Sequence, residues 1–278
     1  MQIVIGLGAA GCNIADKFSA YPQYKTYKID KNLKGKNCFS VSPQKHPEDY
    51  ENNYVPIKKL PKEVAKKEIL FVLSCGHISG LALRMLEQFK KHNCIINVLY
   101  VKPDETLLSQ TAALQQKLMF NVMQEYARSA VFKRVYLVDK NAMAQITGKV
   151  SLRNYYEKIN ELLVSTIHMI NVFNNSESEI DTLSQPFETA RISTIGLCDY
   201  ESGEEKLFFP LDNVREKSYF YGVNENILDS DTFLRDNIIS QLKKNSENGN
   251  IKMSYGVFAT RYEKSYVYCI AHSSKIQS

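Results

Sequence analysis

The chain has 278 residues, of which 44% are hydrophobic and 23% charged, and its formal net charge is +5. This composition excludes a disordered tail and a collagen-like fibre, and no apolar run approaches the roughly 18 residues of a membrane-spanning helix. At about 100–200 residues per domain, the length predicts one large domain or two smaller ones. The basic residues are scattered among acidic ones, so the charge does not indicate a nucleic-acid-binding protein.

The N-terminal half of the sequence alternates short apolar runs with helical patterns. It predicts strands at residues 2–5, 25–29, 69–73, 95–101 and 135–138. It also predicts helices at residues 13–18, 63–67, 81–92 and 107–129, with loops and one short strand in the polar stretch 31–60. Strands that alternate with helices in this way are typical of a doubly wound, mostly parallel α/β sheet with helices on both faces.

From residue 151 the pattern changes to one long helix, which is predicted to end near residue 174. Its surface is so apolar that we expect it to be buried between two bodies. The remainder predicts a smaller α+β domain with strands at 192–197 and 218–223, a helix at 232–244, and a strand pair, 251–261 and 266–272, around the Glu263-Lys264 turn. We therefore divide the chain into a Rossmann-like domain (1–150), a connecting helix (151–175) and a C-terminal α+β domain (176–278).

Glycine is scarce in the chain, with 12 residues or about 4% where about 7% is usual, and several glycines fall in two short clusters. The first cluster, Gly6 to Gly11, has the pattern G-x-G-x-x-G between a strand and a helix. Glycines let the backbone approach a ligand there, and the N–H groups of a helix N-terminus favour an anion. Asp30, at the end of the second strand, is where an NAD-binding domain has its ribose-binding acid, so an NAD-dependent Rossmann oxidoreductase is one alternative. A tight turn that binds nothing is another.

The second cluster, Ser74-Cys75-Gly76-His77-Ile78-Ser79-Gly80, again follows a buried strand and precedes a helix. Two such turns at the ends of neighbouring parallel strands would face each other and could hold a polyphosphate from both sides. A dinucleotide site needs only one of them. Ser79 could add a hydroxyl donor, whereas His77 is more typical of a loop surface than of a ligand.

The order of these features resembles the tubulin/FtsZ family of GTP-binding filament proteins. The first turn is similar to the family's first phosphate loop, whose Asn, here Asn13, contacts guanine, while the second turn matches the family signature only at Gly76, Ser79 and Gly80. The stretches 98–103 and 135–141 resemble two further strand ends, although Lys140 falls where the family has an Asn. The family would place GTP or GDP, with Mg²⁺ as a candidate ion, in a domain corresponding to residues 1–150.

The long helix carries the most specific part of the resemblance. In the family, its first turn has an aromatic residue that stacks on guanine and, four residues later, an Asn or Asp that bonds the base edge. Tyr156 and Asn160 have this spacing and project from one face. The resemblance thus implies a nucleotide site made of nine residues: Gly6, Gly8, Gly11, Asn13, Gly76, Ser79, Gly80, Tyr156 and Asn160.

Departures from the family concern hydrolysis and attachment. The family's catalytic loop follows the long helix and enters the next subunit; the corresponding stretch 179–184 keeps one acid at Asp181, with Glu179 and Ser184 at the other polar positions. We name Asp181 and Glu179 as catalytic candidates, and we expect GTP hydrolysis to be slow or absent. The stretch 104–107 lacks the family's basic patch, and the chain ends without the family's adaptor-binding tail, so attachment to a membrane is not expected.

Several further expectations concern the setting of the protein. The six cysteines form no C-x-x-C pair, and no secretion signal precedes the first strand, which indicates buried free thiols and a cytoplasmic protein. The resemblance implies self-association into filaments, with residues 176–278 as the activation and assembly domain. The size suits a phage or plasmid protein, in which case the host cytoplasm is its location. The alternative is a structural or interaction protein that keeps this fold without hydrolysing nucleotide.

Overall fold

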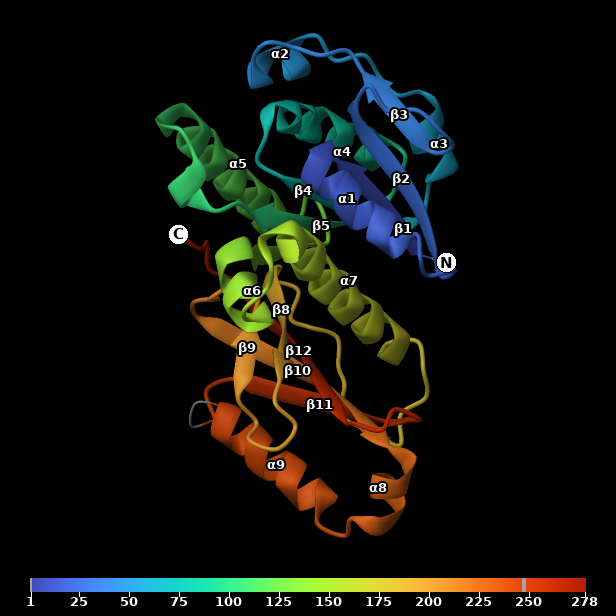
Figure 1. Cartoon of the computed structure of the whole chain (residues 1–278), viewed down its shortest axis with the longest axis vertical. Helices are drawn as coiled ribbons and strands as arrows, with labels where there is room; N and C mark the ends of the chain where they lie inside the picture. The colour runs from blue at the N-terminus through green and yellow to red at the C-terminus, as the bar shows by residue number, and fades with distance from the viewer. Residues whose placement is uncertain (1, 247–248) are drawn as a thin grey trace. The chain divides into compact units, whose positions relative to one another are not determined.

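A computed structural model describes residues 2–246 and 249–278 (Figure 1). The chain divides into two compact units, unit 1 with Met1–Val164 and Ser278, and unit 2 with Ser165–Gln277. The long helix α7 (Tyr155–Phe173) crosses the boundary, so its first ten residues belong to unit 1. Within the described ranges, no helix is both long enough and apolar enough to cross a membrane.

Unit 1 contains a parallel sheet in the order β3-β2-β1-β4-β5-β6. Its strands are β1 (Gln2–Leu7), β2 (Tyr24–Lys31), β3 (Cys38–Val41), β4 (Glu68–Ser74), β5 (Ile95–Lys102) and β6 (Arg134–Asp139). The central strands β1 and β4 are nearly continuous apolar runs because both of their faces are covered. The predicted α/β class with a mostly parallel sheet is confirmed.

Helices connect the strands of unit 1. They are α1 (Gly8–Phe18), α2 (Pro47–Asn52), α3 (Lys59–Glu63), α4 (Ala82–Lys91), α5 (Gln110–Arg128) and α6 (Lys140–Thr147), with short 3₁₀ turns at η1 (His77–Leu81), η2 (Glu105–Leu107) and η3 (Leu152–Asn154).

Several helix boundaries differ from the sequence predictions. The first helix begins at Gly8 and not at Asn13, because the helix starts within the glycine turn itself. The short helix expected at 63–67 ends at Glu63, where the following residues turn into β4 and Lys66 takes a positive φ of 60°. Helix α6 was not predicted at all; the side chain of Asp139 caps it, accepting hydrogen bonds from the backbone of Asn141 and Ala142.

Unit 2 contains a mixed sheet in the order β8-β12-β10-β11-β7, with β9 paired to β8. Its strands are β7 (Ile180–Asp181), β8 (Ile192–Cys198), β9 (Glu205–Leu207), β10 (Val214–Asn224), β11 (Lys252–Thr260) and β12 (Tyr266–Ser273), and its helices are α8 (Glu225–Ser230) and α9 (Leu234–Asn245). Helix α9 packs on the sheet through Ile238 and Leu242, which share a buried cluster with Tyr219 and Cys269 (Figure 1). The strands β7 and β9 and the helix α8 were not predicted.

The strand pair expected around Glu263-Lys264 is wrong. The two strands that flank this turn are not neighbours, because β10 lies between them. It runs parallel to β11, with Tyr219 opposite Tyr255, and antiparallel to β12, with Tyr219 opposite Cys269. The chain after β11 therefore passes over the end of β10 before it returns as β12.

Candidate functional site

The first glycine turn is shaped by close backbone packing. A Cβ atom on Gly6 would lie 2.2 Å from the carbonyl oxygen of Gly11, and a Cβ on Gly11 would lie 2.4 Å from that of Val72 in β4. Gly8 has a φ of +71°, which L side chains rarely adopt. These constraints bring the N-terminus of α1 close to the carboxyl ends of β1 and β4, where parallel-sheet proteins bind phosphates.

Among the described residues, no side chain caps the N-terminus of α1. Its N-cap residue, Leu7, offers no acceptor, so the first N–H groups of the helix are not bonded by a capping side chain. The turn therefore keeps backbone donors available at the end of the sheet, together with the partial positive charge of the helix dipole.

The second turn lies against the first. The Cβ that Gly8 lacks would be only 2.7 Å from Cγ2 of Ile78, so the structure brings the two turns together. Ser79 is buried, and its hydroxyl donates to the carbonyl of Gly76 at 2.6 Å. Gly80 packs on α2, where a Cβ would be 2.0 Å from the carbonyl oxygen of Pro47. Gly76 differs from these residues because a Cβ there would have no neighbour within 4 Å.

Two ion pairs bring α1 and the first turns of α7 together. The Nζ atom of Lys17 lies 2.9 Å from Oε1 of Glu157 and 3.2 Å from Oε1 of Glu161. Asn13 precedes Lys17 by one helical turn, so it lies on the same side of α1. Asn160 is adjacent to Glu161 on α7. Asn13 therefore lies one helical turn from the contact between α1 and the first turns of α7.

The predicted base-reading side chains have free polar groups. The Tyr156 ring is 57% exposed, and Asn160 is half-buried. The side-chain amides of Asn13 and Asn160 form no hydrogen bond within the part of the chain that the structure describes. Tyr155 packs edge-on against Tyr156, with ring centres 5.1 Å apart. The amides of Asn13 and Asn160 are therefore available for hydrogen bonds, whereas the ring of Tyr156 already contacts Tyr155.

A further residue stands at this place. Lys140, the first residue of α6, has its Nζ atom 5.3 Å from the centre of the Tyr156 ring. Burial lowers the pKa of this lysine from its ordinary value. In the sequence, Lys140 stands out only as a departure from the family's Asn. Its contact with Tyr156 has no signal there, because it depends on the position of the unpredicted helix α6.

The segment after β5 carries charges that are already paired. Lys102 forms an ion pair with Glu105, with 3.2 Å between Nζ and Oε1. The carboxylate of Asp104 accepts hydrogen bonds from the backbone and hydroxyl of Thr106 and from the amide of Asn141. These bonds lower the pKa of Asp104. The charged groups at Lys102, Asp104 and Glu105 are therefore engaged within this segment and with Asn141.

The catalytic candidates lie in unit 2, on the outer strand of its sheet. Asp181 is in β7 opposite Gly256, and the backbone of Glu179 donates to the carbonyl of Val257 at 2.8 Å. Both side chains are exposed, and the Asp181 carboxylate accepts a hydrogen bond from the Ser178 hydroxyl. The predicted catalytic stretch is thus attached to a sheet edge, with both acids exposed on the surface of unit 2.

In the parts of the chain that are described, no group of three or more His, Cys, Asp or Glu side chains is placed to hold a metal ion. Asp30, the candidate ribose-binding acid of the NAD alternative, is at the end of β2 and accepts a hydrogen bond from the backbone of Lys31 at 2.7 Å.

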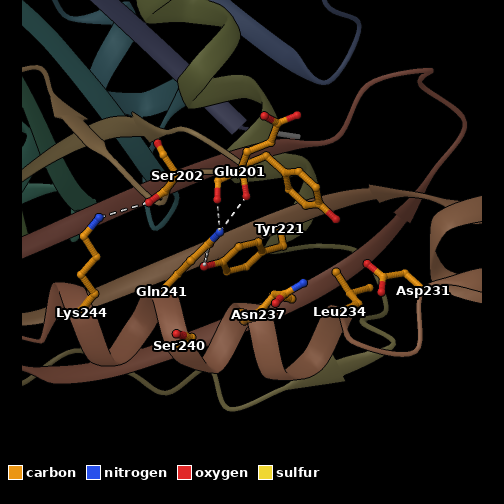
Figure 2. A pocket seen from close by; sticks show the side chains of 11 residues that line it. Glu201, Ser202, Tyr221, Asp231, Leu234, Asn237, Ser240, Gln241 and Lys244 are labelled. Atoms are coloured by element: carbon orange, nitrogen blue, oxygen red, sulfur yellow. Dashed lines mark hydrogen bonds between the residues drawn. The ribbon is translucent and has the colours of Figure 1, made fainter.

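Unit 2 has a cavity of about 490 Å³ between α9 and the turn that joins β8 to β9 (Figure 2). The polar groups around it bond mainly to each other. The amide nitrogen of Gln241 donates to the carbonyls of Tyr200 and Glu201, and Lys244 donates to that of Ser202 (Figure 2). The cavity contains none of the predicted site residues, and its hydrogen bonds fasten the turn to the helix.

A parallel sheet with a glycine turn at its centre, a long helix and a smaller mixed sheet together define the tubulin/FtsZ class of fold. No protein-family model matches the sequence, and no curated protein is significantly similar to it. Solved structures do match it over nearly its whole length.

Several of the matching structures are of filaments or protofilaments. The chain is similar to the GTPγS-form protofilament of Bacillus thuringiensis serovar israelensis TubZ, with a TM-score of 0.74 and 16% identity over 98% of this chain and 88% of that one. It is also similar to a GTPγS-bound protofilament of CetZ2 from Haloferax volcanii, with a TM-score of 0.69 and 14% identity over 98% of this chain and 92% of that one. A third match is an empty FtsZ dimer from M. jannaschii, with a TM-score of 0.67 and 12% identity over 98% of this chain and 88% of that one. The chain therefore has the tubulin/FtsZ fold.

Proposed function

We propose that the protein binds a guanine nucleotide in unit 1 and assembles head to tail into filaments, with weak or absent hydrolysis of GTP. The observation that carries the proposal is the group of unpaired polar atoms around the N-termini of α1 and α7. It comprises the uncapped N–H groups of the first glycine turn and the free amides of Asn13 and Asn160.

The chemistry of this site fits a nucleotide. Uncapped N–H groups at a helix N-terminus bind phosphate, and the open space at Gly76 leaves room beside the second turn. An exposed aromatic ring, Tyr156, offers a stacking surface for a base, and amides can both donate to and accept from its edge. Two of the structural relatives were solved with GTPγS and one with GDP. The fold likewise favours a guanine nucleotide over the NAD alternative.

Weak hydrolysis follows from the residues of unit 2. In the proposed filament, Asp181 and Glu179 face the nucleotide of the next subunit and orient the attacking water. One carboxylate at this position is hydrogen-bonded to Ser178, and Ser184 stands where the family has a second acid. An ordered water needs an acceptor in the correct position. We expect phosphate release to be close to the uncatalysed rate, and Asp181→Ala to remove what remains.

Assembly is proposed from the relatives, which were solved as protofilaments and filaments. A head-to-tail contact uses two different surfaces of the subunit, so it repeats without closing and makes a filament. The cytoplasm is the location that this function implies.

Binding is tested with a thermal-shift panel of GTP, GDP, ATP and NAD, with and without magnesium. A ligand at one hundred times its dissociation constant stabilises by about 2.7 kcal/mol. GTP and GDP should raise the melting temperature of the wild type, and the Tyr156→Ala/Asn160→Ala double variant should lose this shift while its unliganded melting temperature changes little. Equal shifts in both proteins would count against the site.

Light scattering with GTP, GDP and EDTA tests assembly. Scattering that depends on GTP supports the proposed function. Scattering that is identical in all three conditions favours the structural alternative, for which the hydrogen-bonded hydroxyl of Ser79 and the paired carboxylate of Asp181 are the supporting observations.

A further inference from the structure

A lysine without an acidic partner stands beside the first turn of α7. Lys140 contacts the ring of Tyr156, and among residues 2–246 and 249–278 no carboxylate lies within ion-pair distance of its ammonium group. The carboxylate of its neighbour Asp139 accepts hydrogen bonds from the backbone of α6. By contrast, Lys17 and Lys102 in the same unit each have an acidic partner.

The position of Lys140 is unfavourable for a lysine with a purely structural role. Burial removes water from the ammonium group, which lowers the pKa of Lys140. The residue begins α6, where the partial positive charge of the helix dipole opposes a cation. The contact with the Tyr156 ring offsets part of these costs. A charged side chain that lowers stability and lacks a partner is typical of binding sites.

We propose that Lys140 donates hydrogen bonds to the N7 and O6 atoms of the bound base and thereby makes the site prefer guanine to adenine. This inference rests on the proposed function and extends it to the choice of base. An ammonium group has three donors and no acceptor. Guanine presents two adjacent acceptors, O6 and N7, whereas adenine presents N7 beside the N6 amino group, which is a donor.

The side chains of Tyr156, Lys140 and Asn160 then have complementary roles in binding the base. The ring of Tyr156 stacks on the base, so Lys140, which already lies at that ring, is within reach of the base edge. Asn160 carries an amide that can both donate and accept, and it bonds the edge of guanine that carries N–H donors. The flexible stem of Lys140 lets its ammonium group move from the ring to the base when the nucleotide binds.

The test uses the full chain and two matched variants. Lys140→Met keeps the length of the side chain without its charge, and Lys117→Met is the control, because Lys117 is exposed on α5 and forms no ion pair in the described structure. Binding of GTP, ATP and 7-deaza-GTP, which lacks the N7 acceptor, is measured by calorimetry.

Lys140→Met should weaken GTP binding by about 5- to 100-fold and ATP binding by less, because adenine offers only the N7 acceptor, while Lys117→Met binds like the wild type. The wild type should bind 7-deaza-GTP more weakly than GTP, and Lys140→Met should bind the two alike. The unliganded Lys140→Met protein should melt at the same temperature as the wild type or higher, which separates lost binding from lost folding.

Other outcomes distinguish the failures. If the wild type binds GTP and Lys140→Met keeps both its affinity and its preference over ATP, the role of Lys140 is wrong and the proposed function stands. Tighter GTP binding by Lys140→Met would mean that Lys140 blocks the site. Equal binding of GTP and 7-deaza-GTP by the wild type overturns the inference without any variant. If the wild type binds no nucleotide, both proposals fail.

Discussion

The two glycine turns of unit 1 lie side by side, but their glycines are required for different reasons. In the first turn, Gly6 and Gly11 face backbone atoms of the protein itself, and Gly8 has a positive φ. In the second, Gly80 alone is held by close backbone contact, while Gly76 is extended and has open space around it. The fold therefore requires all three glycines of the first turn, whereas in the second turn it requires Gly80 and not Gly76.

The largest effect is expected for Gly11→Ala. The new methyl group would overlap the carbonyl of Val72 in the central strand β4, and neither α1 nor the strand can move away. We expect the free energy of unfolding to fall by about 3 kcal/mol or more, or the variant to fail to fold. The melting temperature of the purified variant measures it, with Gly76→Ala as the matched control. A melting temperature equal to that of the wild type would contradict the packing argument.

A smaller effect is expected for Gly80→Ala. Its methyl group would overlap the carbonyl of Pro47, but Pro47 begins a six-residue helix that can shift. We expect the free energy of unfolding to fall by about 1–3 kcal/mol, and proteolysis around α2 to become faster. Limited proteolysis with mass spectrometry locates the change. Cleavage confined to other segments would show that α2 does not absorb the overlap.

Gly76→Ala should leave stability within about 0.5 kcal/mol of the wild type, because its φ of −178° suits any residue and the new methyl group meets no atom. Nucleotide binding should nevertheless weaken, since the methyl group would enter the space proposed for the phosphates. Paired thermal melts and GTP titrations measure both quantities. Unchanged GTP affinity would remove Gly76 from the site.

The smallest effect concerns the thiol reactivity of two cysteines, one from each turn. Cys12 is buried and its thiol donates to the carbonyls of Gly6 and Ile29; burial raises its pKa to about 12. Cys75 is only half-buried, and burial raises its pKa as well. At pH 8 a thiol reagent should therefore modify Cys75 before Cys12, as peptide mass spectrometry would detect. The reverse order would contradict the burial of the first turn.

The raised pKa of Cys12 also has a consequence for stability. Between its ordinary value of 9.0 and about 12, the unfolded chain loses the thiol proton while the folded chain keeps it. The free energy of unfolding therefore falls as the pH rises through this range. In Cys12→Ala this part of the pH dependence should be absent, which chemical denaturation at a series of pH values measures.

Local patterns were sufficient to predict much of unit 1. Unbroken apolar runs marked its central strands, because a strand covered on both faces needs no polar alternation. The G-x-G-x-x-G pattern located the first turn, since only glycine fits against the carbonyl oxygens there. The four-residue spacing of Tyr156 and Asn160 predicts that both lie on one side of a helix, and both belong to α7 in the structure.

Features that depend on distant contacts were missed. Strand β7 has only two residues and exists because β11 offers its edge. Lys140 contacts Tyr156 because α6 begins directly at the end of β6. Asp139, the residue that caps α6, was the one sign of this helix in the sequence. The neighbours of β10 could not be inferred either, because a short turn between two apolar runs usually indicates a hairpin.

The insertion of β10 between β11 and β12 also constrains the order of folding. The last two strands cannot begin as a local hairpin, because each makes its hydrogen bonds to a strand that precedes it by many residues. Pairing across such long loops carries a large entropic cost and slows folding. The sheet of unit 2 can therefore close only after most of its sequence has left the ribosome, and the edges of β10 stay unprotected until then.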